Sequence, residues 1–161
     1  MKTILTKEQI EHKILRMSFE IIETNLEEKE IELIGLEKNG FIIAEKIGKQ
    51  IAKKSNLKVN ITKMSLNKKN KNEATFSQKI NPGKKTVILI DDVLKSGETI
   101  IYAIKELLNY KIKKLKTAIL INRKHNIFPV GVNYVGLELS TTLEEHIKVV
   151  FGNKKDGAFL N

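Results

Sequence analysis

A short segment near the middle of the chain constrains the fold more than any other. Val87 to Ile90 is an unbroken run of strand-forming residues, which is typical of a central strand covered on both faces. Asp91 and Asp92 follow at once, and a loop containing Gly97 then leads into residues with helical spacing. A buried strand followed by a short loop and a helix predicts an α/β domain with a mainly parallel sheet.

The rest of the chain repeats this alternation. Thr6 is placed to cap a first helix. Helical spacing of apolar residues occurs in 10–22, 42–51 and 100–108, and strand-like runs occupy 31–36, 59–66, 118–121 and 147–151. We therefore expect the 161 residues to form a single domain, in which a twisted parallel sheet is flanked by helices.

Composition excludes several classes of protein. Hydrophobic residues make up 41% of the chain and charged residues 30%, which indicates a globular protein and not a disordered one. The chain has no cysteine, so disulfides and thiolate metal sites are excluded, and its three histidines lack the spacing of metal ligands. No apolar run approaches the roughly 18 residues of a membrane span, and the first residues do not resemble a signal peptide. We expect a cytoplasmic protein with no membrane partner.

The formal net charge of +10 invites a nucleic-acid interpretation. Only Arg16 and Arg123 are arginines, so 27 of the 29 basic residues are lysines. Proteins that recognise phosphates and bases favour arginine, because its planar guanidinium forms paired hydrogen bonds. The charge is better interpreted as a lysine-rich surface whose positive potential attracts a polyphosphate substrate.

The loop after Asp92 has the composition of a phosphate site. It lies at the carboxyl end of a buried strand, where open α/β sheets bind ligands, and its backbone amides precede a helix. The two carboxylates would repel a phosphate but accept hydrogen bonds from hydroxyl groups, so the segment is suited to a ribose 5-phosphate. The residues expected to bind the phosphate are Lys95, Ser96, Gly97, Glu98 and Thr99.

Two other phosphate motifs fit less well. Gly35 and Gly40 have the spacing of the two glycines of a P-loop, but Phe41 and Ile42 stand where a lysine and a serine or threonine are required. The glycine pattern of dinucleotide-binding folds is absent from the sequence. ATPase and dinucleotide-binding functions are therefore not expected.

The segment from Val87 to Thr99 resembles the signature of the type I phosphoribosyltransferases over 13 residues, with Ser96 where threonine is common. The resemblance implies that Asp91 and Asp92 bind the ribose hydroxyls of 5-phosphoribosyl-1-pyrophosphate (PRPP) and take part in catalysis. It also implies that Mg²⁺ accompanies PRPP, although no direct protein ligand for the metal is predicted.

Two further segments gain a role from this resemblance. The pyrophosphate loop of the family corresponds to Leu36, Glu37, Lys38, Asn39 and Gly40, with a cis peptide expected near Leu36 and Glu37. The polar stretch 67–73 corresponds to the catalytic flexible loop, in which Lys68 stands where close relatives carry an arginine. Lys68 is therefore a third candidate catalytic residue.

The branch of the family that the chain resembles most is the bifunctional pyrimidine-operon attenuator and uracil phosphoribosyltransferase. The similarity includes 121–130 and 133–136, and it implies a small hood, mainly from 122–146, with Arg123 and His125 near the base. Lys95 replaces an aspartate of hypoxanthine-guanine enzymes, and a protonated lysine cannot accept a proton from a purine. The expected reaction joins a base, with uracil favoured, to the ribose 5-phosphate of PRPP and releases pyrophosphate.

Two alternatives remain open. In the first, the chain is an RNA-binding regulator that keeps the site as a sensor of PRPP or a nucleotide. In the second, it is a purine phosphoribosyltransferase with an altered acceptor site. Leu15 and Phe19 stand where the attenuator's RNA-binding helix carries a threonine and a histidine, which argues against RNA as a partner. Relatives commonly form dimers or larger homo-oligomers, so a second copy of the chain is an expected partner.

Overall fold

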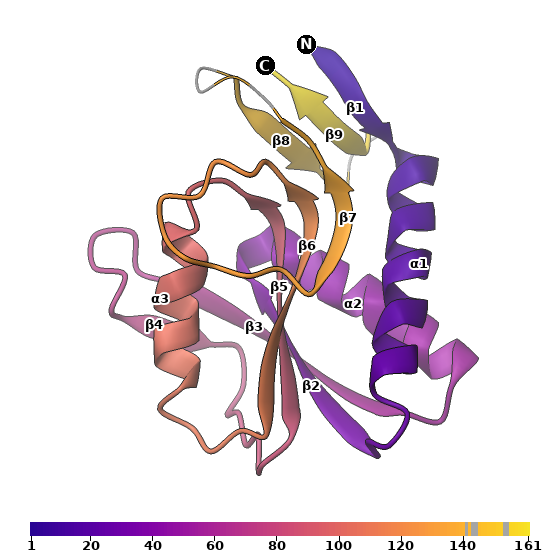
Figure 1. Cartoon of the computed structure of the whole chain (residues 1–161), viewed down its shortest axis with the longest axis vertical. Helices are drawn as coiled ribbons and strands as arrows, with labels where there is room; N and C mark the ends of the chain where they lie inside the picture. Colours follow the sequence, from indigo (N-terminus) through magenta and orange to yellow (C-terminus); the bar gives the residue numbers. More distant parts are fainter. Residues whose placement is uncertain (141, 143–144, 153–154) are drawn as a thin grey trace.

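The computed structural model describes residues 1–140, 142, 145–152 and 155–161. Its elements alternate as the sequence predicts (Figure 1). The helices are α1 (Lys7–Thr24), α2 (Glu37–Lys54) and α3 (Glu98–Leu107). The strands are β1 (Lys2–Thr6), β2 (Glu30–Leu36), β3 (Lys58–Leu66), β4 (Ala74–Phe76), β5 (Thr86–Leu94), β6 (Lys114–Asn122), β7 (Tyr134–Glu138), β8 (Ile147–Val150) and β9 (Gly157–Leu160).

The main sheet has the strand order β4-β3-β2-β5-β6-β7. All neighbouring strands from β3 to β7 run parallel, and β4 adds an antiparallel edge. This confirms the predicted α/β fold. After β2 the chain adds β3 on one side of the sheet, and after β5 it adds β6 on the opposite side. The direction in which strands are added therefore reverses between the neighbouring strands β2 and β5. Open α/β sheets bind their ligands at such a point.

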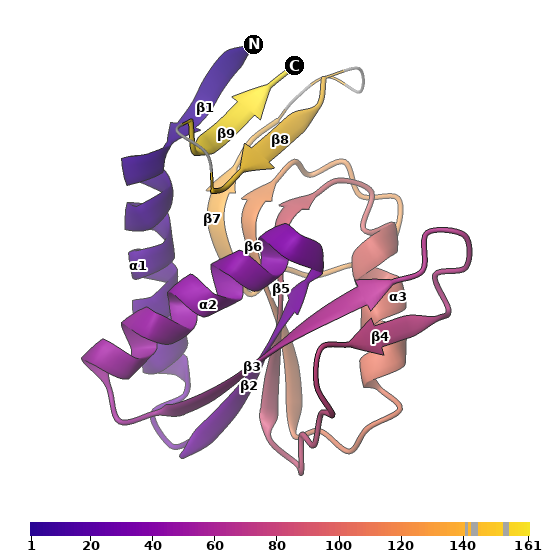
Figure 2. The same cartoon turned by 180° about the vertical axis from the view of Figure 1, so that it is seen from behind.

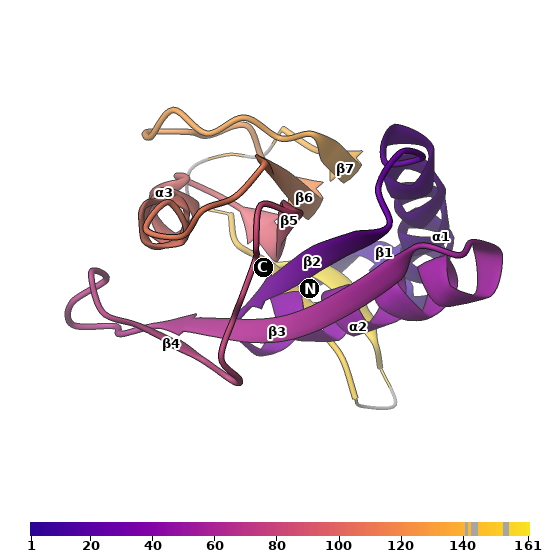
Figure 3. The ribbon, with the colours of Figure 1, turned by 90° about the horizontal axis from the view of Figure 1, so that it is seen from below.

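The sheet is covered on both faces, as the apolar run in β5 predicts. Ile88 and Ile90 belong to a core formed with α1 and α2, whereas Val87 and Leu89 belong to a second core formed with α3. Figure 3 shows α1 and α2 on one side of the sheet and α3 on the other. Alternate residues of one strand therefore serve two separate cores.

The first helix begins where the sequence indicates. The Thr6 hydroxyl accepts a hydrogen bond from the Gln9 amide at 3.2 Å, and the Gln9 side chain accepts one from the Thr6 amide at 2.9 Å. This reciprocal pair is a capping box, and it confirms Thr6 as the N-cap of α1. No helix within the described residues is both long and apolar enough to cross a membrane.

A second, smaller sheet is built from both ends of the chain. Its strand order is β1-β9-β8, with antiparallel pairing throughout (Figure 2). We expected a hood mainly from 122–146, of which 141, 143 and 144 lie outside the described residues. Within this range, 134–138 form β7, which pairs in parallel with β6 at the edge of the main sheet. The part that lies over the carboxyl ends of the main strands is the β1-β9-β8 sheet (Figure 2).

Candidate functional site

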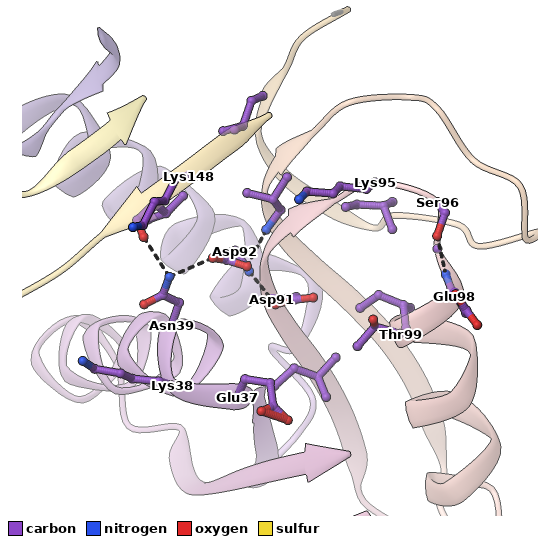
Figure 4. Close-up of a pocket in the computed structure, with 17 residues that line it drawn as sticks. Glu37, Lys38, Asn39, Asp91, Asp92, Lys95, Ser96, Glu98, Thr99 and Lys148 are labelled. Atoms are coloured by element: carbon purple, nitrogen blue, oxygen red, sulfur yellow. Dashed lines mark hydrogen bonds between the residues drawn. The ribbon is translucent and has the colours of Figure 1, made fainter. Parts of the chain in front are cut away.

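A pocket of about 590 Å³ lies at the carboxyl ends of β2 and β5. Four separate segments line it: the start of α2, the end of β5, the loop that enters α3, and β8 (Figure 4). It brings together most of the residues predicted from the sequence, namely Leu36, Glu37, Lys38, Asn39, Asp91, Asp92, Lys95, Ser96, Gly97, Glu98 and Thr99. The pocket therefore joins segments that are far apart in the chain.

The acidic pair lies on the part of β5 that extends beyond its pairing with β2. The register of β2 against β5 ends at Gly35 and Ile90, whereas β5 remains paired with β6 as far as Leu94. Beyond Ile90 the β2 side of β5 thus faces the pocket. The strand runs past the acids to Leu94, although the sequence suggested that it ends at them. In Figure 4 the Asp92 side chain extends toward Asn39, and Asp91 lies on the side of Thr99.

The two carboxylates are held by nearby amides. The Asp91 carboxylate accepts a hydrogen bond from the Asp92 amide at 2.9 Å, and the Asp92 carboxylate accepts one from the Val93 amide at 2.8 Å. Burial raises the pKa of Asp91 well above its usual range, and the adjacent charge of Asp92 raises that pKa further. A ligand that offers hydroxyl donors or a cation to this pair would favour its ionised form.

The loop into α3 has the geometry of a phosphate cradle. Gly97 adopts a left-handed conformation with φ 87°, and a Cβ atom there would lie 3.2 Å from the Phe128 carbonyl oxygen. The Ser96 hydroxyl accepts a hydrogen bond from the Glu98 amide at 3.2 Å. The Ser96 carbonyl accepts bonds from the amides of Ile127 and Phe128, so the segment after β6 supports the loop. A glycine is required here for both conformation and space.

The predicted pyrophosphate segment differs from expectation. Residues 37–40, expected in a loop, form the first turn of α2, with Leu36 as its N-cap. No cis peptide occurs among the described residues. Instead, Glu37 has a positive φ of 55°, and its carboxylate accepts a hydrogen bond from the Leu66 amide at 2.9 Å. The first amides of α2 have no partner within the helix, so they suit an anion at this side of the pocket.

Gly40 acts through packing. It is buried and is not part of the pocket wall, and a Cβ atom on it would lie 2.6 Å from the Ile90 carbonyl oxygen. The close approach of α2 to β5 is therefore possible only because glycine has no side chain. Because Ile90 immediately precedes the acidic pair, this contact fixes the start of α2 relative to Asp91.

Asn39 connects three elements. Its side-chain amide nitrogen donates to the Asp92 carboxylate and to the Val149 carbonyl of β8, both at 2.9 Å (Figure 4). Both hydrogens of that nitrogen are used, so Asn39 orients Asp92 and attaches the small sheet to the main one. The sequence placed Asn39 in the site but gave no sign of this bridge.

Besides Gly40, three further predicted residues lie outside the pocket wall. Lys68 is in the loop between β3 and β4. Arg123 is 4% exposed, and its guanidinium donates to the Thr142 carbonyl at 3.0 Å. His125 follows β6 and is partly exposed. Because Arg123 and His125 do not line this pocket, their role beside a base stays a prediction.

The β8 strand is the part of the site that the sequence analysis missed. Ile147, Lys148 and Val149 line the pocket. Ile147 and Val149 are buried in the core with α1 and α2, whereas Lys148 is exposed. The alternation of apolar residues predicted this strand, but its position over the acidic pair depends on pairing with β9, which local pattern does not reveal.

The loop of residues 67–73 lies beside α3 (Figure 2). The Lys71 ammonium is 3.1 Å from the Glu98 carboxylate, and Lys105 of α3 donates to the Asn72 side chain. Glu98 belongs to the predicted phosphate-binding segment, so this segment and the predicted flexible loop contact each other directly.

Comparison with known proteins identifies the family. The model of the phosphoribosyl transferase domain matches residues 1–152. The chain belongs to this family. A relative from Haemophilus ducreyi, named bifunctional protein PyrR, is 32% identical, and the match covers 92% of this chain and 88% of the relative. The protein of the same name from Clostridium botulinum is 30% identical over 96% of this chain and 91% of its own. These relatives confirm the branch indicated by the sequence.

Solved structures of this family share the fold. A hypoxanthine-guanine phosphoribosyltransferase from Bacillus anthracis has a TM-score of 0.74 at 23% identity, covering 87% of this chain and 82% of that one. The hypoxanthine phosphoribosyltransferase of Trypanosoma cruzi has a TM-score of 0.77 at 16% identity, with the same coverage. At these identities the likeness establishes the phosphoribosyltransferase fold alone.

Proposed function

We propose that this phosphoribosyltransferase transfers the ribose 5-phosphate of PRPP to a ring nitrogen of a nucleobase, with uracil favoured, and releases pyrophosphate. The observation that carries the proposal is one pocket in which an acidic pair lies between a phosphate loop and the start of a helix. The three parts match the diol, the 5′-phosphate and the pyrophosphate of a single donor molecule.

Each segment has a distinct role in this proposal. The amides and hydroxyls of 95–99 bind the 5′-phosphate, while Asp91 and Asp92 accept hydrogen bonds from the ribose hydroxyls. The amides at the start of α2 bind the leaving pyrophosphate. The remaining side of the pocket is bordered by β8, so the base would lie between β8 and the ribose. Catalysis then depends on positioning and electrostatic stabilisation and involves no covalent intermediate with a side chain.

Magnesium fits this arrangement as a companion of the donor. Within the described part of the chain no group of three or more acidic or histidine side chains is arranged to hold a metal ion. Mg²⁺ binds few protein ligands and often takes the rest from substrate phosphates and water. Asp91 and Asp92 are the carboxylates that would contact it, and a bound ion would neutralise charge on the leaving pyrophosphate.

One contact favours the enzyme over the RNA-binding regulator. Arg16, the basic residue on α1 that the RNA interpretation would use, donates to the carbonyls of Val135 and Gly136 at 3.2 and 2.7 Å and pairs with Glu20. Its guanidinium thus covers the outer edge of β7. An RNA ligand would have to compete for a group with several partners in the protein.

Turnover with a panel of bases tests the proposal. We expect pyrophosphate release from PRPP and Mg²⁺ with uracil, and slower or no release with hypoxanthine, guanine, xanthine or orotate. Isothermal titration with PRPP and Mg²⁺ in the absence of base serves as the control for donor binding. Donor binding without release for any base would contradict the enzymatic proposal and would favour a sensor. Fastest release with a purine would contradict only the choice of base.

Asn39 offers a second test of the site. We expect Asn39→Ala to lower kcat/KM for PRPP by roughly 10- to 100-fold, because a hydrogen bond to a charged group contributes about 1.5–3 kcal/mol. Asn39→Asp keeps the size of the side chain but puts a carboxylate against Asp92 and the Val149 carbonyl, so it should lose more activity. Steady-state kinetics and circular dichroism of both variants check this. Full activity in Asn39→Asp would show that the bridge does not matter.

A further inference from the structure

Glu98 is an acidic residue in a segment that is proposed to bind a phosphate. It is the first residue of α3, directly after the left-handed Gly97, and it lines the pocket together with the rest of 95–99. The start of a helix favours an anion, so a carboxylate at this position is favourable by itself. A dianionic phosphate bound by the same amides would be repelled by it. Phosphate binding at 95–99 therefore requires that the charge of Glu98 be offset.

The cation that offsets this charge comes from a different part of the chain. The Lys71 ammonium lies 3.1 Å from the Glu98 carboxylate, and the two side chains are 33% and 41% exposed. Among the described residues, Lys71 is the only basic group within 4.0 Å of that carboxylate. In Figure 4 the Glu98 side chain extends away from Asp91 and Asp92. Lys71 does not line the pocket, so it contacts the phosphate-binding segment from outside.

The loop that carries Lys71 is held compact by its own hydrogen bonds. The Asn67 amide donates to the Glu73 carbonyl at 2.9 Å, and the side chains of the same two residues are hydrogen-bonded at 3.1 Å. The loop is also attached to α3, because the Lys105 ammonium donates to the Asn72 side chain. An ordered loop of this kind loses little conformational freedom when its lysine forms an ion pair.

We infer that Lys71 is a positioning residue for the 5′-phosphate, which neutralises Glu98 so that a phosphate can bind at 95–99. This role rests on the proposed function, which supplies the identity of the ligand. It differs from the catalytic role expected of Lys68, because Lys71 acts through a carboxylate of the phosphate-binding segment. A partly exposed ion pair adds little to the stability of a fold, so its loss should affect binding and not unfolding.

Titration of the full chain with ribose 5-phosphate tests this role, because the ligand carries the 5′-phosphate without the pyrophosphate. At low ionic strength Lys71→Met should weaken binding by roughly three- to tenfold, since Glu98 is left without a compensating charge. Lys69→Met removes the same charge from an exposed position in the same loop and should change the affinity by less than about twofold. In about 1 M salt, where the screening length falls to about 3 Å, the difference between the two variants should shrink.

Variants of Glu98 provide the decisive control. Glu98→Gln should bind ribose 5-phosphate at least as tightly as the wild type, and the addition of Lys71→Met to it should cost less than about twofold. Lys71→Arg keeps the charge and should keep the affinity. In steady-state kinetics, Lys71→Met should raise the KM for PRPP with little change in kcat, whereas a catalytic role for this lysine would lower kcat.

The possible outcomes separate this role from the proposed function. Unchanged affinity in Lys71→Met, an equal loss in Lys69→Met, or a loss of the same size in the Glu98→Gln background would overturn the role of Lys71 while leaving PRPP binding intact. A lower melting temperature in Lys71→Met would overturn it too, because the loss would then be structural. A wild-type chain that binds neither ribose 5-phosphate nor PRPP would contradict the proposed function, and the role of Lys71 with it.

Discussion

Asp91→Asn should make the protein more stable and at the same time nearly inactive. The pKa of Asp91 is raised by burial, with Asp92 adding to the effect, so the folded state disfavours the ionised form. Wild-type stability should therefore fall as the pH rises from the ordinary aspartate range through the raised pKa of the folded protein. An asparagine has no charge to bury, and this loss disappears in the variant.

The activity change follows from the same residue. The carboxylate is proposed to accept hydrogen bonds from the ribose, and two such bonds to a charged group contribute enough that kcat/KM should fall by roughly 100-fold or more. Thermal melting between acidic and neutral pH, together with pyrophosphate release, measures both effects. Glu45→Gln removes one negative charge from the exposed surface of α2 and serves as the control. Lower stability of Asp91→Asn at neutral pH, or wild-type turnover, would contradict the prediction.

Gly40→Ala should separate the start of α2 from β5. The added Cβ atom would lie 2.6 Å from the Ile90 carbonyl oxygen, which belongs to the backbone of a central strand and cannot move aside as a side chain would. Overpacking of this kind costs about 1–3 kcal/mol. Because α2 begins at the proposed pyrophosphate site and Ile90 precedes Asp91, we also expect PRPP affinity to fall at least tenfold.

The same helix supplies a matched control. In Gly48→Ala the new Cβ atom would meet the Cδ1 atom of Ile61 at 2.5 Å, which is the end of a flexible side chain. That contact relaxes by a rotamer change, and alanine is favoured over glycine in a helix by up to about 1 kcal/mol. Denaturant unfolding and titration with PRPP should therefore separate the two variants clearly. Equal stability and equal affinity would show that the α2–β5 contact tolerates a methyl group.

Local chemistry made the proposed PRPP-binding side of the pocket predictable. The apolar run before Asp91, the acidic pair and the glycine loop are consecutive, so strand, charge and turn could all be inferred from one segment. The structure places them as expected, except that β5 runs on past the acids because β6 continues to pair with it. Gly97 was correctly singled out, since its left-handed conformation and tight contact are properties that the residue type alone suggests.

The side of the pocket formed by β8, where the base is proposed to bind, could not be predicted in the same way. The small sheet depends on pairing between Lys2–Thr6 and Gly157–Leu160, and short strands without a connecting turn carry no signal of their partner. For the same reason Lys148 was missed, and nothing local in the sequence indicates that Arg123 is buried and bonded to the Thr142 carbonyl. The expected cis peptide came from the family resemblance and not from any local feature. At this position the chain instead has a positive φ at Glu37.

Because the small sheet is built from both ends of the chain, the two sides of the pocket form in a defined order. Residues 30–138 contain every strand of the main sheet, so the segments proposed to bind PRPP can assemble before the two ends of the chain pair with each other. The border formed by β8 must wait for β9, which in turn pairs with the very first strand. The side of the pocket proposed to receive the base is therefore completed after the side proposed to bind the sugar phosphate.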